Sequence, residues 1–303
     1  MNDALDLYKD IKIGIIGGSL QAFICMPFLT WKFAIQGNIP LPKITDFRKF
    51  YRGSIQQITA HTPNTVIQIL SNNILLNYLN KKEISLHEKL LCSSMSGGIG
   101  AVIFTPVDNL TIFQQKNNIS LLETLEGKPI QTISNAPKKI PLMETPQQQQ
   151  RPTPWERIPN YTQIRTSWLK GHESLSLYRG LNATLIREAI YCSGLLTIGP
   201  FFTSNLEKNT AYFNNNHTIA NLIGSFGSGL FASSISHPFD TAKTKIQADL
   251  NGEKYISIRQ TISKIIHEKG APTLFVGIIP RTLQISSAFY IINTVKEYFM
   301  IKI

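Results

Sequence analysis

The sequence predicts an all-α membrane protein, and three observations lead to this fold class. Only 16% of the 303 residues are charged, whereas soluble proteins contain roughly 25%. Uncharged windows recur along the chain, and most reach the roughly 18–20 residues that span a bilayer core. Polar stretches separate these windows, which cover residues 13–31, 54–80, 90–107, 189–206, 209–239 and 282–295. A soluble array of helical repeats is the alternative, but it would need a charged face on each helix, and the windows lack one.

The net charge of +11 raises the question of nucleic acid as a partner. The chain has no dense basic run with interleaved aromatic residues, and its positive residues flank the apolar windows instead. Anionic lipid headgroups account for such a placement, so we expect membrane lipids as partners and no nucleic acid. The first ten residues resemble neither a signal peptide nor an Arg-rich transit peptide, so any import into an organelle would use internal signals.

The three cysteines predict buried free thiols. Cys25, Cys92 and Cys192 lie within apolar windows and without the spacing of metal ligands. The six histidines are scattered, and the sequence shows no Ser/His/Asp constellation or phosphate-binding loop. We therefore expect no metal site, no enzyme activity and no cofactor.

A threefold internal repeat organises the chain. It is anchored on three prolines, Pro27, Pro106 and Pro238. Nine residues after each proline stands a glutamine, and nine residues before each stands a glycine: Gln36, Gln115 and Gln247, and Gly18, Gly97 and Gly229. Small residues let transmembrane helices approach closely, and proline within a helix kinks it. The repeat therefore predicts three kinked, closely packed spans.

A second repeated feature precedes the other three spans. It is an aromatic-x-Gly triplet, found as Tyr51-Arg52-Gly53, Tyr178-Arg179-Gly180 and Phe275-Val276-Gly277. Free backbone N–H groups at the start of a helix form a site for phosphate. We therefore expect lipid phosphate groups to bind at Arg52, Gly53, Arg179, Gly180 and Gly277.

After the third proline, residues 238–247 read PFDTAKTKIQ, and an amphipathic segment follows at residues 255–270. With this signature the chain resembles the mitochondrial carrier family, from about residue 10 to residue 299. The resemblance implies three tandem two-helix repeats that form a six-transmembrane-helix pseudo-threefold bundle, with short amphipathic helices on the matrix side. It also implies a multi-pass protein of the mitochondrial inner membrane with both termini on the intermembrane-space side, and cardiolipin as the bound lipid.

The expected repeats cover residues 1–84, 85–208 and 209–303. The second contains a polar insert rich in Gln and Pro at about residues 117–160, whose composition cannot build its own core. Other subunits of an inner-membrane complex are candidate partners for this insert. In the first repeat, residues 37–50 contain too many helix breakers for a full surface helix.

In the family, the acid of each signature pairs with the basic residue of another and closes the matrix end. Two such pairs are implied here, Asp240 with Lys32 and Asp108 with Lys243. Neutral residues replace both members of the third pair, which would join Leu29 and Thr111, and a neutral pair avoids a stranded charge. The glutamines of the repeat, Gln36, Gln115 and Gln247, would brace this gate.

The family also closes its opposite end, with an aromatic-acid-x-x-basic motif on the even-numbered helices. The stretches around Asn72, Gly199 and Lys296 show no match to it. We therefore expect no charged network at that end.

Substrate contacts in the family lie about seven residues beyond each aromatic-x-Gly. Counting gives Ala60 with its neighbour His61, then Arg187 with Glu188, and Gln284. An ionisable residue inside a span is a functional hypothesis by default, although a structural role for His61 is the stronger reading.

The resemblance and the chemistry of Arg187 and Glu188 both suggest an amino acid or similar zwitterion. A guanidinium binds a carboxylate bidentately, and a carboxylate binds an ammonium group. Neighbouring positions on a helix differ by about 100°, so we expect the two side chains to diverge toward the two ends of one ligand. With Arg187 as the one cationic contact, nucleotides are disfavoured, and Glu188 disfavours dicarboxylates.

Two functions stay open. The first is a solute carrier that works by alternating access, favoured by the intact third signature and by Arg187 and Glu188. The second is a degenerate carrier-fold protein without transport that serves as a structural subunit of a large respiratory-type complex. The eroded first two signatures and the missing outer motif favour this second function.

Overall fold

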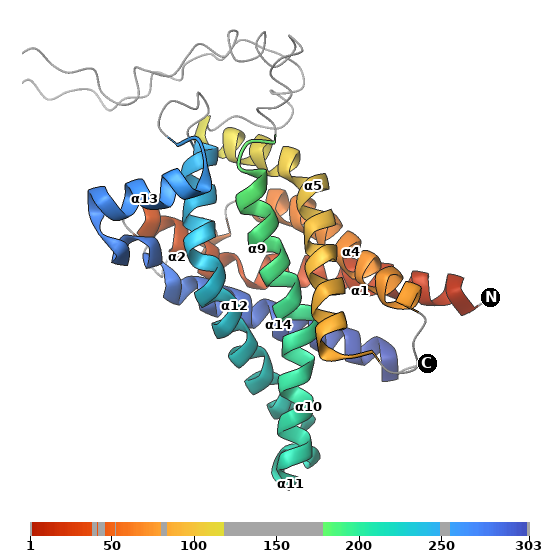
Figure 1. Ribbon diagram of the computed structural model, residues 1–303. Coiled ribbons are helices and arrows are strands. Elements are labelled where there is room, and N and C mark those ends of the chain that lie inside the picture. Colours follow the sequence, from red (N-terminus) through yellow and green to blue (C-terminus); the bar gives the residue numbers. More distant parts are fainter. Residues whose placement is uncertain are drawn as a thin grey trace, which may run out of the picture. The chain divides into compact units, whose positions relative to one another are not determined.

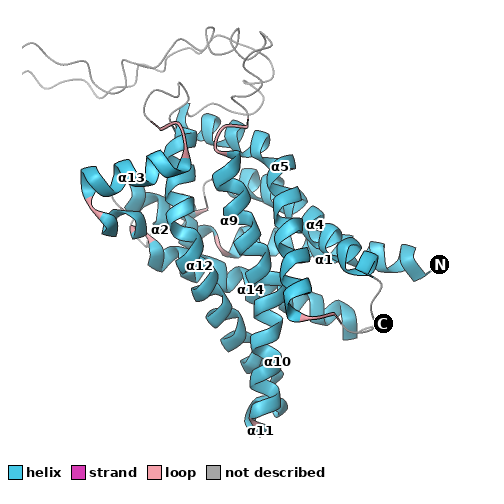
Figure 2. Cartoon of the chain, viewed as in Figure 1, coloured by secondary structure: helices cyan, strands magenta, loops and turns pink. Residues whose placement is uncertain are grey.

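The computed structural model describes residues 2–37, 41, 46–51, 53–79, 84–117, 178–248 and 255–301. These residues are helical apart from short turns, as the colouring in Figure 2 shows. The chain divides into two compact units, Met1–Ile112 with Tyr178–Ile303 and Phe113–Leu177. All contacts below lie within the first unit. The predicted insert at residues 117–160 lies outside the described residues, except for its first residue at the end of a helix.

Figure 1 shows the helices of the described residues in chain order. Their bounds are α1 Asn2–Ile24, α2 Met26–Gly37, α3 Phe47–Phe50, α4 Ser54–Leu79, α5 Leu86–Asn117, α9 Leu181–Ser193, α10 Gly199–Asn209, α11 Ala211–Asn215, α12 His217–Ala248, α13 Ile258–Lys269 and α14 Ile278–Ile301. A π-helical turn, Gly194–Ile198, joins α9 to α10, and a 3-10 turn, Ala271–Phe275, precedes α14.

Four helical segments of the described chain are long and apolar enough to cross a membrane. They are Leu86–Asn109, Leu181–Asn209, His217–Gln247 and Ala271–Phe299. The bent pair of α1 and α2 makes a fifth if it is counted as one span. The sixth predicted span falls in α4, which is not among them. That helix is rich in Gln, Asn and Thr, and it buries Thr65, Gln68 and Asn72.

The three repeat prolines lie in helical segments. The chain bends by 51° between α1 and α2, next to Pro27, the second residue of α2. Pro106 lies inside α5 and Pro238 inside α12, and both helices continue through the proline. In the first repeat the predicted kink is therefore an interruption between two separate helices, α1 and α2.

Three glycines at equivalent repeat positions allow close helix contacts. Gly18 in α1 lies against Thr62 and Thr65 of α4, Gly97 in α5 against the backbone of Glu188 in α9, and Gly229 in α12 against Ser286 in α14. Each contact falls eight or nine residues beyond the glycine of an aromatic-x-Gly (62 − 53, 188 − 180 and 286 − 277). A side chain at Gly97 or Gly229 would meet the backbone of the facing helix.

The first and last helices run antiparallel to each other. Gly17 of α1 lies against Ile292 and Val295 of α14, whereas Cys25, just beyond α1, donates its thiol to the carbonyl oxygen of Gln284 at 3.5 Å. The beginning of α1 and the end of α14 consequently lie at the same end of the unit.

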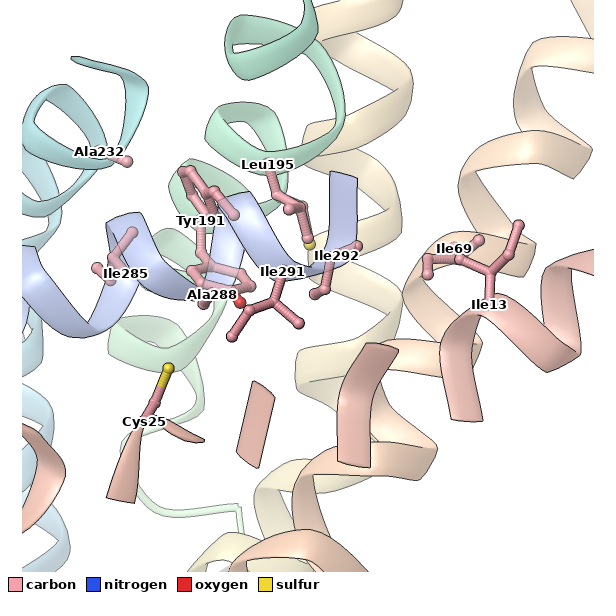
Figure 3. Packing of buried hydrophobic residues seen from close by; sticks show 12 residues of the cluster. Ile13, Cys25, Ile69, Tyr191, Leu195, Ala232, Ile285, Ala288, Ile291 and Ile292 are labelled. Atoms are coloured by element: carbon pink, nitrogen blue, oxygen red, sulfur yellow. The ribbon is translucent and has the colours of Figure 1, made fainter. Parts of the chain in front are cut away.

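The buried apolar cluster joins residues from α1, α4, α9, α12 and α14, and Figure 3 shows most of its members. Ile13 and Ile69 approach each other from α1 and α4. Tyr191 packs its ring against that of Phe289, with centroids 5.2 Å apart. Inside a membrane the lipid is as apolar as these side chains, so close van der Waals packing rather than removal from water holds the helices together. This cluster thereby anchors the helices around the site described next.

The surface helices follow the sequence prediction. Residues 258–269 form the amphipathic helix α13, which buries Thr261 and Ile265, and the hydroxyl of Ser257 accepts a hydrogen bond from the backbone N–H of Gln260 at its start. In the first repeat the corresponding helix, α3, has only four residues. The breakers in residues 37–50 explain this truncation because they leave few positions that favour a helix.

Candidate functional site

A small polar cavity, partly open to its surroundings, lies among α1, α4, α9 and α14. Its lining residues are Gln21, His61, Arg187, Glu188, Tyr191, Arg281, Gln284, Ile285 and Ala288. Four of the five predicted substrate contacts, His61, Arg187, Glu188 and Gln284, therefore come together here. Ala60 is half-buried and does not line the cavity.

Arg187 and Glu188 converge rather than diverge. They form an ion pair with each other, and Oε2 of Glu188 also accepts a hydrogen bond from Nε2 of Gln68 in α4 at 2.9 Å. The expectation of diverging side chains was wrong because the arginine side chain is long enough to fold back across 100° of helix surface. The pairing of Arg187 with Glu188 avoids the cost of two isolated charges in the protein interior.

Arg281 is a second cation in the cavity, and counting repeat positions missed it. Its Nη1 atom donates to Oε1 of Gln284 at 3.5 Å, and the residue is only 5% exposed. Arg281 precedes Gln284 by three positions, and residues three apart share a face of a helix. The three-residue spacing from Gln284 could have identified Arg281 as a cavity residue. Arg281 was overlooked because it lies one residue before the uncharged window at residues 282–295.

Asp240 of α12 is the centre of a buried charge cluster. It is paired with Lys32 of α2 through Oδ2, while its Oδ1 atom lies 3.8 Å from Nη1 of Arg187 and 3.6 Å from Nη2 of Arg281. With Glu188, the cluster contains three cations and two anions. Its formal charge is therefore +1, and the surplus is next to the cavity.

Both implied ion pairs are formed in the structure. Lys32 pairs with Asp240, and Nζ of Lys243 lies 2.8 Å from Oδ2 of Asp108. At the position of the third pair, Leu29 is half-buried, and the side chain of Thr111 is outside the described residues.

The three glutamines predicted to brace these pairs differ in what surrounds them. Gln36 donates to the carbonyl oxygen of Val276 at 3.5 Å. Gln247 is buried, and neither of its side-chain polar atoms has a hydrogen-bond partner. The side chain of Gln115 is outside the described residues.

The opposite end of the unit carries a charged cluster that the sequence did not predict. His217, at the start of α12, pairs with Glu207 of α10, and its Nε2 atom lies 2.9 Å from Oε2 of Glu297 in α14. Asn221 also approaches Glu297, at 3.4 Å. The expectation of no charged network at this end was wrong because the three residues stand outside the positions of the family motif and meet only through helix packing.

The three glycines of the aromatic-x-Gly triplets each precede a helix. Gly53, Gly180 and Gly277 have φ angles of 87°, 77° and 87°, a left-handed conformation that favours glycine. Arg179 uses its guanidinium within the protein, since Nε donates to the carbonyl of Ile246 at 3.1 Å and a terminal nitrogen to that of Tyr255 at 2.8 Å. Arg52 lies outside the described residues.

The three cysteines are free and buried, as predicted. Among the residues that the structure describes, no group of three or more His, Cys, Asp or Glu side chains is placed to hold a metal ion.

Comparisons with known proteins agree with this fold. Residues 214–302 match the family model described as mitochondrial carrier protein. The chain is 24% identical over 260 residues to mitochondrial glutamate carrier 1 of Rattus norvegicus, covering 82% of this chain and 75% of that protein. It is 24% identical over 263 residues to a probable mitochondrial 2-oxodicarboxylate carrier of Dictyostelium discoideum (84% and 74%). It is also 25% identical over 207 residues to mitochondrial thiamine pyrophosphate carrier 1 of Scheffersomyces stipitis (68% and 56%).

Helices that are long and apolar enough to cross a membrane thus surround a charged cavity. The match of residues 214–302 to the family model and the similarity to these three carriers over most of the chain are consistent with a divergent mitochondrial carrier. Members of that family are transporters rather than enzymes and need no cofactor, and the similar carriers point to a multi-pass protein of the mitochondrial inner membrane.

Proposed function

We propose that the protein is a mitochondrial solute carrier for an amino acid. The observation that carries the proposal is the meeting of Arg187 and Glu188 in one cavity with a second arginine, Arg281. Arg187 would bind the substrate carboxylate and Glu188 its ammonium group. Glu188 is buried, Arg187 is half-buried, and the two are held close together. A zwitterion would replace their mutual contact with two new charge-assisted hydrogen bonds.

The charge balance favours an acidic amino acid. Lys32, Arg187 and Arg281 outnumber Asp240 and Glu188 by one, and an acidic amino acid carries the matching charge of −1. The expectation that nucleotides are disfavoured rested on Arg187 as the one cationic contact, and the presence of Arg281 weakens it. Relatives named glutamate carriers agree with this substrate class. A 2-oxodicarboxylate has no ammonium group, so it would leave Glu188 facing an anion.

Alternating access would use the charge pairs at one end of the unit as the matrix gate. These are Lys32 with Asp240 and Lys243 with Asp108, with the glutamines Gln36, Gln115 and Gln247 beside them. We propose that α4 completes six spans in a pseudo-threefold bundle of three repeats, covering residues 1–84, 85–208 and 209–303. The equivalent glycine contacts of Gly18, Gly97 and Gly229 support this arrangement. Both termini would then face the intermembrane space.

Cardiolipin is the lipid that we propose at the starts of α4, α9 and α14. Backbone N–H groups beyond Gly53, Gly180 and Gly277 would bind its phosphate groups. The guanidinium of Arg179, with donors committed to the carbonyls of Ile246 and Tyr255, would support the loop rather than supply the main contact.

Uptake into liposomes tests the substrate class. The purified protein is reconstituted, and exchange is measured for radiolabelled L-glutamate, L-alanine, 2-oxoglutarate and thiamine pyrophosphate. We expect L-glutamate to be exchanged at least about tenfold faster than L-alanine, because alanine lacks the second carboxylate that the extra cation would bind. Faster exchange of 2-oxoglutarate would exclude an ammonium-binding role for Glu188. If none of these compounds is exchanged, the proposal of an amino-acid carrier is wrong.

The alternative function is that of a structural subunit without transport, and it draws on the missing aromatic-acid motif at the outer end. A native gel of mitochondrial membranes in mild detergent tests it. A carrier is expected to migrate as a single chain of 34.0 kDa with its bound detergent and lipid. Comigration with a large respiratory complex, together with loss of that complex on deletion of the gene, would favour the structural role.

A further inference from the structure

Two arginines of the cavity are turned toward the protein's own carboxylate. Arg187 and Arg281 both lie against the same oxygen of Asp240, at 3.8 and 3.6 Å, whereas Lys32 contacts the other oxygen. Both arginines line the cavity, and Asp240 is not among the lining residues. One oxygen of the buried Asp240 carboxylate therefore faces the two arginines of the cavity, and the other oxygen faces Lys32 of the gate.

We propose that Asp240 competes with the substrate for Arg187 and Arg281. Before substrate enters, Asp240 attracts both guanidinium groups. The carboxylates of an entering substrate then bind these guanidinium groups in place of Asp240. Asp240 is then left with Lys32 alone. Arg281 becomes a substrate-binding residue. Because Asp240 contacts both the cavity arginines and Lys32, substrate binding in the cavity changes the charge interactions of the gate pair. This inference rests on the proposed amino-acid carrier function and extends it to regulation of the same site.

The contacts to Asp240 are close enough to attract but too long to be good hydrogen bonds. Distances of 3.6 and 3.8 Å exceed the 2.7–3.2 Å range of N–H···O hydrogen bonds. The Nε atoms of Arg187 and Arg281 are also buried without any hydrogen-bond partner. Buried donors without a partner are costly, so both arginines have hydrogen bonds still to make, and a bound carboxylate would supply the acceptors.

The second gate pair is linked to the cavity less directly, because Asp108 attracts Arg187 only from a distance. Asp108 pairs with Lys243 at 2.8 Å, and no ion pair in the described part of the chain joins it to either arginine. The two implied gate pairs are therefore not equivalent. Neutralising Asp240 removes an anion that both arginines approach, whereas neutralising Asp108 removes a gate partner and only a longer-range attraction on Arg187.

That difference supplies a matched pair of variants, Asp240→Asn and Asp108→Asn, in the full-length purified carrier. Binding of L-glutamate in detergent is measured by the shift of the unfolding temperature with ligand concentration, and exchange is measured in liposomes. We expect Asp240→Asn to bind L-glutamate about tenfold more tightly than wild type because its internal competitor is gone. Asp108→Asn should change the affinity much less, and both variants should exchange more slowly because a gate pair is lost.

A second pair of variants keeps the proposal testable if Asp240→Asn does not fold. Arg281→Gln should weaken L-glutamate binding by about tenfold or more, and it should weaken L-alanine binding much less. In the double variant Asp240→Asn/Arg281→Gln, the gain from losing Asp240 should shrink, because one of the two contested cations is gone. Equal affinities for glutamate in wild type, Asp240→Asn and Arg281→Gln would overturn the competition.

The outcomes separate this inference from the function on which it rests. If wild type exchanges L-glutamate but Asp240→Asn binds it no more tightly than Asp108→Asn, the carrier function stands and the competition does not. If wild type neither binds nor exchanges any amino acid, both are lost.

Discussion

Replacing Arg187 with glutamine is expected to reduce L-glutamate exchange by at least about 100-fold, the largest functional effect of any single substitution in the cavity. Removing one partner of a buried, hydrogen-bonded charge pair costs about 3–5 kcal/mol, and each 1.4 kcal/mol is a factor of ten. The variant would lose the guanidinium that binds the substrate carboxylate. Glu188 would keep its hydrogen bond from Gln68 but lose its ion pair. Initial rates in liposomes measure the loss.

Stability must be separated from transport in this experiment, because a stranded Glu188 also destabilises the fold. The double variant Arg187→Gln/Glu188→Gln removes both charges, so its unfolding temperature should recover toward that of wild type while its exchange stays low. Arg187→Lys keeps the charge but not the bidentate geometry, so its rate should fall between wild type and Arg187→Gln. Wild-type exchange by Arg187→Gln would show that the carboxylate binds elsewhere.

Gly97→Ala is expected to produce the largest loss of stability for the smallest change in the chain. A methyl group at this position would overlap the backbone of Glu188 on the facing helix, and the backbone cannot move aside as a side chain can. Overpacking of this kind costs about 1–3 kcal/mol, which lowers the unfolding temperature by several degrees. Differential scanning fluorimetry in detergent measures the shift.

The neighbouring Gly98 provides the matched control. A methyl group there would meet only the Cδ2 atom of Leu185, at an ordinary contact distance of 3.7 Å. Alanine favours helix over glycine by up to about 1 kcal/mol, so Gly98→Ala should be neutral or slightly stabilising. Equal unfolding temperatures for the two variants would contradict the close contact of α5 with α9.

Much of the helical framework could be predicted from local patterns. Uncharged windows indicated the segments now seen in α5, α9 with α10, α12 and α14, and breakers in residues 37–50 predicted the short α3. The prediction was weakest for α4, where Thr65, Gln68 and Asn72 face the interior. An absence of charge does not distinguish a lipid-facing helix from one that buries polar groups, because hydropathy averages over all faces of the helix.

The candidate site was predicted in part. Counting along the repeats identified Arg187, Glu188, His61 and Gln284, which line one cavity. It missed Arg281 and Gln21, because one lies three residues before the counted position and the other is on α1, where no contact was sought. Repeat counting finds equivalent positions, but it does not measure the reach of a long side chain from a neighbouring position.

The sequence by itself indicated the resemblance to mitochondrial carriers, the helical composition and the level at which charges enter the cavity. These follow from spacing along the chain, which repeats and helix periodicity preserve. Only the tertiary structure decided that Arg187 folds back onto Glu188, that Arg281 joins it at Asp240, and that His217 lies between two glutamates at the other end. The reason is physical: a buried charge takes whichever partner packing brings within reach, and that partner can be distant in sequence.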